Sequence, residues 1–173
     1  MWRHTAACIA LLTLAACAVA PREPLPQLTS IPRAFEMSGR LAVRHADRSD
    51  IAKLRWTRRP GSDLWVIASP LGNEVARIES GPGGATLRRA GAPAENAASF
   101  QALTERTLGV PLDPDAMAGW LHGARPSGAP GDWNVSIDEV QPAGDVDLAK
   151  RITATRGDTV VKLVVDEYRE LGE

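Results

Sequence analysis

Few side chains in this sequence are placed to do covalent chemistry, and the clearest of them is the thiol of Cys17. It ends the stretch Leu14-Ala15-Ala16-Cys17 and closes an apolar run over residues 6–16, which Arg3 and His4 precede. The run is too short to span a bilayer. It is typical of a lipoprotein signal peptide, in which the thiol takes a diacylglyceryl group and the chain is cut before the cysteine. We therefore predict a signal over residues 1–17 and lipidation of Cys17; the alternative is an ordinary secretory signal in which Cys17 is incidental.

The chain that remains after residue 17 is 156 residues long, which is the size of one domain. It carries 19 basic and 21 acidic residues, a balance that does not indicate a nucleic-acid partner. Cys8 falls within the predicted signal and Cys17 at its edge, so the folded domain has no thiol for a disulfide, a metal or a nucleophile. Residues 18–32 contain four prolines and are predicted to form a flexible tether, followed by one domain over residues 33–173.

Catalytic or metal-binding constellations are not apparent in that domain. His45 lies in an expected turn and His122 at an expected helix end, and the two are not spaced as metal ligands. Residues 81–84 are rich in glycine, but no helix with a phosphate-binding lysine follows them. Asp113 is explained as a helix cap, and Arg156-Gly157-Asp158 as a hairpin turn. We expect a protein that binds or carries something, and not an enzyme, with no cofactor and no metal.

The elements that would position a binding surface are mostly strands. Alternation of apolar and polar residues, or a short apolar run between turns, predicts them over residues 35–44, 51–57, 64–69, 74–80, 85–89, 133–138, 148–155 and 159–168. Residues 64–69 are apolar on both faces, which predicts a strand covered on both sides. Helical spacing predicts helices over residues 94–108 and 114–122. Because the turns are short, we expect a mainly β, α+β fold: a curved antiparallel sheet with helices on one face or end.

A strongly curved sheet with helices over it would enclose an apolar hollow. Strand alternation selects six candidates for the lining of that hollow: Met37, Leu41, Leu54, Trp56, Trp133 and Val135. The alternative is that the tryptophans simply fill a core.

Several segments together resemble the LolB family. They are FEMSGRLAVR at 35–44, KLRWTRRPGSDLWVIASPLGNEVARIE at 53–79, LTERTLGVPL at 103–112, AGWLHGARP at 118–126, and the closing DWNVSIDEV and LAKRITATRGDTVVKLVVDEY. The resemblance spans residues 35–168, with Ala149 where a proline is expected and Ile137 where an aromatic residue is common. It implies an unclosed β-barrel with a helical lid over an apolar cavity.

The resemblance implies a role as well. Proteins similar to LolB accept lipoproteins from the periplasmic carrier LolA and insert them into the outer membrane. The expected partners are that carrier, the acylated cargo and outer-membrane lipids, and the chain is expected to act as a monomer that faces the periplasm. In such proteins a loop protrudes and its leucine contacts the membrane. Pro70, Leu71 and Gly72 match that loop, although a leucine in a turn is ordinarily buried against a neighbour.

A different class of function shares the same anchor. A structural outer-membrane lipoprotein would hold an envelope assembly together through its surface, and it would need no hollow. An enzyme that acts on lipid is a third possibility, but the sequence offers no nucleophile with an adjacent base. The hollow therefore separates the two main hypotheses.

Overall fold

The fold is built almost entirely from one sheet. The computed structural model describes residues 31–123, 133–144 and 146–172, so Cys17 and most of the expected tether lie outside the described residues. The strands are β1 (Phe35–His45), β2 (Arg48–Arg59), β3 (Ser62–Ala68), β4 (Glu74–Gly81), β5 (Gly84–Arg89), β6 (Glu95–Ala97), β7 (Asn134–Ala143), β8 (Val146–Arg156) and β9 (Thr159–Glu170). The helices are α1 (Phe100–Leu108) and α2 (Pro114–Leu121). Within the described ranges, neither helix has the length and apolar character needed to cross a membrane.

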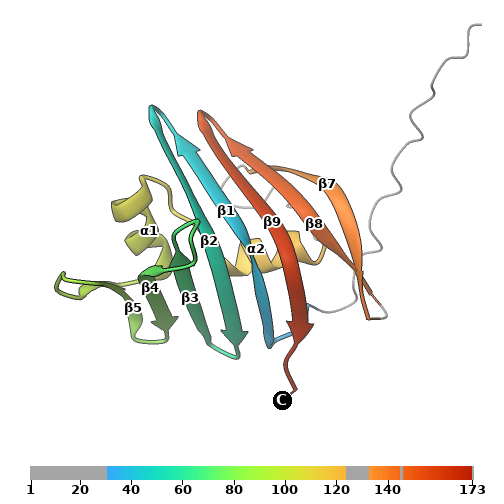
Figure 1. The fold of residues 1–173 in the computed structure, drawn as a ribbon, viewed down its shortest axis with the longest axis horizontal. Coiled ribbons are helices and arrows are strands. Elements are labelled where there is room, and N and C mark those ends of the chain that lie inside the picture. The colour runs from blue at the N-terminus through green and yellow to red at the C-terminus, as the bar shows by residue number, and fades with distance from the viewer. Residues whose placement is uncertain (1–30, 124–132, 145, 173) are drawn as a thin grey trace, which may run out of the picture.

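The sheet has nine strands in the order β6-β5-β4-β3-β2-β1-β9-β8-β7. All the pairings are antiparallel, and β1 lies in the middle because it pairs with β9 as well as with β2. The edge strands β6 and β7 do not pair with each other, so the barrel stays unclosed (Figure 1). Both helices contribute side chains to the same buried cluster as the sheet. This confirms the predicted mainly β architecture with an unclosed antiparallel sheet and two helices.

The central strand shows how the alternation in the sequence becomes a bent sheet. Its inward-facing apolar side chains are all buried, as predicted: Phe35, Met37, Leu41 and Val43. Gly39 lies between them, beside a shift in the pairing of β1 with β9. A Cβ atom on Gly39 would collide with the carbonyl oxygen of Val164. Glycine therefore allows the two strands to approach at the bulge that bends the sheet.

The helices begin and end at capping residues. Asp113 accepts a hydrogen bond from the backbone N–H of Asp115 at 2.8 Å and caps α2, as predicted. Ser99 caps α1 in the same way, with a bond of 3.1 Å from the N–H of Ala102. Gly109 ends α1 with a φ of 75°, in the left-handed region that glycine adopts freely. The two helices are short, and local capping residues set where they begin and where α1 ends.

Two expectations from the sequence were wrong. The predicted helix over residues 94–108 begins only at Phe100, because residues 95–97 pair with β5 as strand β6 and Ser99 caps the helix after them. The strand over residues 64–69 was predicted to be covered on both sides, but Leu64 and Val66 are only half-buried. Their face of β3 is the outer face of the sheet, opposite the buried Trp65. Half-exposed aliphatic side chains are common on such faces.

Candidate functional site

A row of aromatic side chains crosses the inner face of the sheet. The ring of Phe35 lies 5.6 Å from Tyr168 and 4.9 Å from Trp56. Trp56 lies 5.5 Å from Trp65, which in turn lies 4.7 Å from Phe100 at the start of α1. Rings at these distances attract each other beyond the apolar area they bury. The row joins β9, β1, β2, β3 and α1 into one apolar interior.

An apolar hollow of about 330 Å³ opens beside this row. Strands β1 to β5 and the end of α1 line it, with these apolar residues: Leu41, Val43, Ile51, Ala52, Leu54, Ile67, Val75, Ala76, Ile78, Leu87 and Leu108. The polar residues at its border are Arg48, Asp50, Lys53, Arg89 and Thr107. Val75 is 46% exposed at the border, so the apolar lining reaches the surface. The hollow is therefore open to the outside along this border.

The six residues predicted to line a hollow fall in three places. Leu41 and Leu54 line the hollow itself. Met37 and Trp56 are fully buried in the cluster to which α2 contributes its own apolar side chains. Trp133 and Val135 are partly buried on the other side of the barrel. There Trp133 lies 5.5 Å from Trp120.

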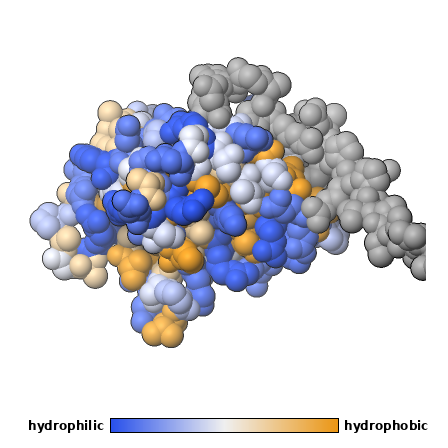
Figure 2. Space-filling view, turned by 90° about the horizontal axis from the view of Figure 1, so that it is seen from above, coloured by the Kyte–Doolittle hydropathy of each residue, from blue (hydrophilic) through white to orange (hydrophobic). Residues whose placement is uncertain are grey.

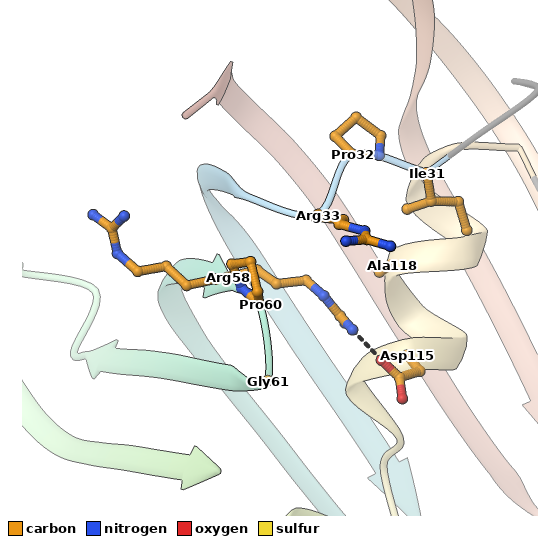
Figure 3. Close-up of a pocket in the computed structure, with 9 residues that line it drawn as sticks. Ile31, Pro32, Arg33, Arg58, Pro60, Gly61, Asp115 and Ala118 are labelled. Carbon is orange, nitrogen blue, oxygen red and sulfur yellow. Dashed lines mark hydrogen bonds and ion pairs between the residues drawn. The ribbon is translucent and has the colours of Figure 1, made fainter. Parts of the chain in front are cut away.

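Helix α2 is tied to the sheet at its N-terminus by Arg58. The guanidinium donates to the carbonyl oxygen of Pro114 at 3.0 Å and forms an ion pair with Asp115 (Figure 3). It also lies 3.8 Å from Asp63, which accepts a hydrogen bond of 2.7 Å from the indole N–H of Trp56. Burial raises the pKa of the Asp63 carboxyl, although Trp56 and Arg58 act in the opposite direction. Arg58 therefore joins the end of β2 to the first turn of α2.

The C-terminus of α2 is tied to the sheet by His122, which is 2% exposed. One ring nitrogen, Nδ1, lies 2.7 Å from the carbonyl oxygen of Ala118, and Nε2 lies 2.9 Å from the hydroxyl of Tyr168. A neutral ring satisfies both contacts: Nδ1–H donates to Ala118, and Nε2 accepts from Tyr168. Burial lowers the pKa of His122 and raises that of the Tyr168 phenol. Both groups are therefore held in their neutral forms.

We expect His122 to make the fold less stable as the pH falls. The histidine of the unfolded chain takes up a proton below its ordinary pKa of 6.5, whereas burial lowers the pKa in the folded state. Above that pH both states are neutral at this position. Below it the free energy of unfolding falls by up to about 1.4 kcal/mol per pH unit. Urea unfolding between about pH 7.5 and 5.5 should show that the free energy of unfolding falls more steeply with decreasing pH for the parent than for His122→Gln. If the two proteins lost stability in parallel over this range, His122 would not have this role.

The connection between β3 and β4 is a tight turn with an exposed apolar tip. The backbone N–H of Gly72 donates to the carbonyl oxygen of Ser69 at 2.8 Å, and that of Ser69 donates to the carbonyl oxygen of Asn73 at 2.8 Å. Gly72 has a φ of 94°, which a residue with a side chain rarely adopts. Leu71 is 90% exposed at the tip, next to the exposed Pro70. Figure 2 shows one narrow projection that ends in hydrophobic atoms.

The sequence model of a family described as "Outer membrane lipoprotein LolB" matches residues 33–168. An outer-membrane lipoprotein LolB from Chromobacterium violaceum is 33% identical over 172 residues, which cover 91% of this chain and 94% of the relative. One from Dechloromonas aromatica is 32% identical over 179 residues, covering 91% and 92%.

The unclosed barrel and its apolar hollow define a protein built to hold an apolar ligand against a sheet. With the family match over residues 33–168 and relatives aligned over nearly their whole length, the chain belongs to the LolB family of outer-membrane lipoproteins. The residue that would carry the lipid, Cys17, lies outside the described residues.

Proposed function

We propose that this chain accepts acylated lipoproteins from the periplasmic carrier LolA and inserts them into the outer membrane. The observation that supports this best is the apolar hollow beside Leu41 and Leu54, in a chain of the LolB family. Three acyl chains of roughly a dozen or more CH₂ groups, at about 0.8 kcal/mol each, make transfer through water cost on the order of 30 kcal/mol. A protected apolar surface removes that barrier. In this role the chain, acting as a monomer, binds and passes on its cargo without catalysing a reaction.

The size of the hollow sets a condition on uptake. A hollow of about 330 Å³ is small beside three acyl chains of roughly a dozen or more CH₂ groups each. We therefore expect the cargo to widen the hollow, either by moving α1 away from the sheet or by displacing side chains. We expect the acyl chains to start beside Leu41 and Leu54 and to extend toward Met37 and Trp56. The Trp133 and Val135 side of the barrel would be reached last.

The exposed tip of the β3–β4 turn has a role in this proposal. Exposing one leucine costs about 1.5–3 kcal/mol relative to burying it. Polar residues usually occupy the tip of a tight turn, and they would avoid this cost. The exposed side chain of Leu71 therefore supports a role in contact with the bilayer. We propose that Pro70, Leu71 and Gly72 form the loop that enters the membrane when cargo is released.

The proposed anchor is Cys17. Replacing it in Cys17→Ala removes the thiol that would take the lipid, while every buried hydrophobic residue of the described core lies between Ala34 and Val165. We expect the variant to fold normally, to incorporate no labelled palmitate and to leave the outer membrane. Membrane fractionation and palmitate labelling measure this. A variant that still took up the label would contradict the anchor.

A cross-linking experiment tests the receptor role. Residues 18–173 contain the whole described core, so this chain is expected to fold without the signal or the lipid. A photo-reactive residue is placed at Leu41, which lines the hollow, or at Arg40, which is exposed on the outer face. The chain is then mixed with LolA loaded with a lipoprotein whose acyl chains are labelled.

We expect the label to be captured at Leu41 and not at Arg40, as LolA loses its cargo. A scaffolding lipoprotein would leave the cargo on LolA and capture nothing at either position. Equal capture at both positions would mean that the acyl chains do not enter the hollow.

A further inference from the structure

Basic side chains without partners gather on the outer face of the central strands. Arg44 of β1, Lys53 and Arg55 of β2, and Lys162 of β9 are all exposed. None of these four makes a hydrogen bond or an ion pair with another described residue, although ten pairs of Arg or Lys with Asp or Glu are present in the described ranges, including that of Arg40 with Asp166 on this same face. The whole chain has a formal charge of only −1. Positive charge is therefore concentrated on this surface, which we call the basic face.

The register of the strands places like charges directly opposite each other. Lys53 of β2 pairs with Arg40 of β1, and both point away from the buried face that Leu54 occupies. Arg40 has one acidic neighbour, Asp166, at 3.5 Å, but Lys53 has none. Like charges across a strand pair destabilise a sheet. The fold tolerates this repulsion although a neutral residue would remove it, which suggests that the positive charge serves a partner.

The basic face also carries exposed apolar groups, and these decide the kind of partner. Ile51 is 66% exposed and lies two residues before Lys53 on the same face of β2. The β3–β4 turn begins directly after Ala68, the register partner of Lys53, and presents Leu71 with 90% exposure. Aliphatic side chains among lysines and arginines match the boundary between acyl chains and headgroups of a bilayer. A soluble acidic protein would match the charges but not the two exposed aliphatic residues.

We propose that the basic face binds the anionic headgroups of a phospholipid bilayer and so orients the barrel on the membrane. Lys53 and Ile51 also border the apolar hollow. With the basic face on the headgroups, the Leu71 turn and the mouth of the hollow both lie beside the bilayer. The acyl chains would then leave the hollow into lipid and not into water. This inference rests on the proposed function for its purpose, but the binding itself can be measured without cargo.

The test uses residues 18–173 and vesicles of phosphatidylcholine, alone or with about a third of phosphatidylglycerol. Lys53→Gln with Arg55→Gln removes two cations of the basic face. Arg33→Gln with Arg59→Gln removes two exposed cations that likewise have no described partner and border the pocket of Figure 3. This control pair has the same change of net charge; Arg59 is the last residue of β2, and Arg33 precedes β1. Co-sedimentation gives the partition coefficient of each chain.

We expect the parent to prefer the anionic vesicles and to lose that preference as salt rises from about 0.05 to 0.5 M. Each cation near an anionic surface is worth about fivefold in partitioning, so the Lys53 and Arg55 pair should lower it by about 30-fold. The Arg33 and Arg59 pair should stay within about twofold of the parent. The Lys53 and Arg55 variant should unfold in urea at the parent concentration or above it, because it loses like-charge repulsion.

Three results would overturn the proposal. The parent could bind both kinds of vesicle equally, which would mean that anionic headgroups are not recognised. The two double variants could lose binding equally, which would make net charge and not the basic face responsible. The Lys53 and Arg55 variant could also bind vesicles like the parent and yet fail to take cargo from LolA, which would assign the face to the carrier. Cross-linking at Leu41 reports separately on the receptor role, so failure of either inference is recognisable.

Discussion

Replacement of Leu71 by glutamate is expected to abolish delivery of lipoproteins to a bilayer while leaving the protein folded. Leu71 is 90% exposed in a turn held by backbone hydrogen bonds, so the side chain contributes little to the core. Leu71→Glu should change the free energy of unfolding by no more than about 0.5 kcal/mol, as for other surface substitutions. A carboxylate is costly to place among acyl chains. The variant should therefore accept cargo from LolA and fail to release it into liposomes.

The controls use the same position. Leu71→Ile and Leu71→Phe keep the apolar area and should retain much of the delivery, because contact with lipid depends on area more than on shape. Delivery is measured as cargo that floats with liposomes, and uptake as cargo lost by LolA. A loss of several kcal/mol of stability in Leu71→Glu would mean that the leucine packs in a core. Delivery at the parental rate would mean that the turn does not act at release.

The strands can be predicted because each has one face on the core. The alternation of Phe35, Met37, Leu41 and Val43 is enough to identify the inner face of β1, and the burial of all four side chains confirms it. Strand β6 cannot be predicted in this way. Three residues are too few to show a period of two, and a single hydroxyl, that of Ser99, decides where the following helix begins.

Alternation does not separate a hollow from a core. It identifies the face of the sheet on which a side chain lies, but not what covers that face. Helix α2 buries Met117 and Leu121 in the same cluster as Met37 and Trp56. The hollow stays open beside Leu41 and Leu54, where α1 ends at Leu108. The difference depends on where two short helices rest, which is a property of the tertiary fold.

The contacts that hold α2 in place cannot be read from the sequence either. The local pattern shows His122 only as a residue at a helix end, because its partner Tyr168 lies 46 residues away. Arg58 and Asp115 are 57 residues apart, and in the sequence each resembles an ordinary charged residue at the surface. These two contacts tie both ends of α2 to the sheet, and the bonds of Arg58 to Pro114 and of His122 to Tyr168 are partly buried. The ties of α1 to the sheet are exposed: Arg48 donates to the carbonyl oxygen of Thr107 at 3.4 Å, and Arg106 donates to that of Asn96 at 2.9 Å. Because water competes with exposed hydrogen bonds, we expect α1, and not α2, to yield when cargo enters.

Replacement of Trp56 by alanine is expected to have the largest effect on stability of any single change considered. The side chain is fully buried, its ring lies 4.9 Å from Phe35 and 5.5 Å from Trp65, and its N–H donates to Asp63. Truncating a buried tryptophan costs about 3–5 kcal/mol. The loss of the donor to a partly buried carboxyl adds about 1–3 kcal/mol. Because domains of this size have about 5–15 kcal/mol in total, Trp56→Ala should be close to unfolding.

Trp56→Phe separates the two contributions and keeps the experiment informative if the alanine variant does not fold. It keeps an aromatic ring in the row and removes the donor to Asp63, so it should cost about 1–3 kcal/mol in urea unfolding. The measurement also decides what Trp56 is for. If Trp56 is a core residue, Trp56→Ala should show the large loss of stability expected here. If Trp56 lines an open cavity, its truncation should cost little stability, because the space it leaves joins a hollow that already exists. A cost below about 1 kcal/mol for Trp56→Ala would therefore place Trp56 in the lipid-binding wall and extend the hollow across the aromatic row.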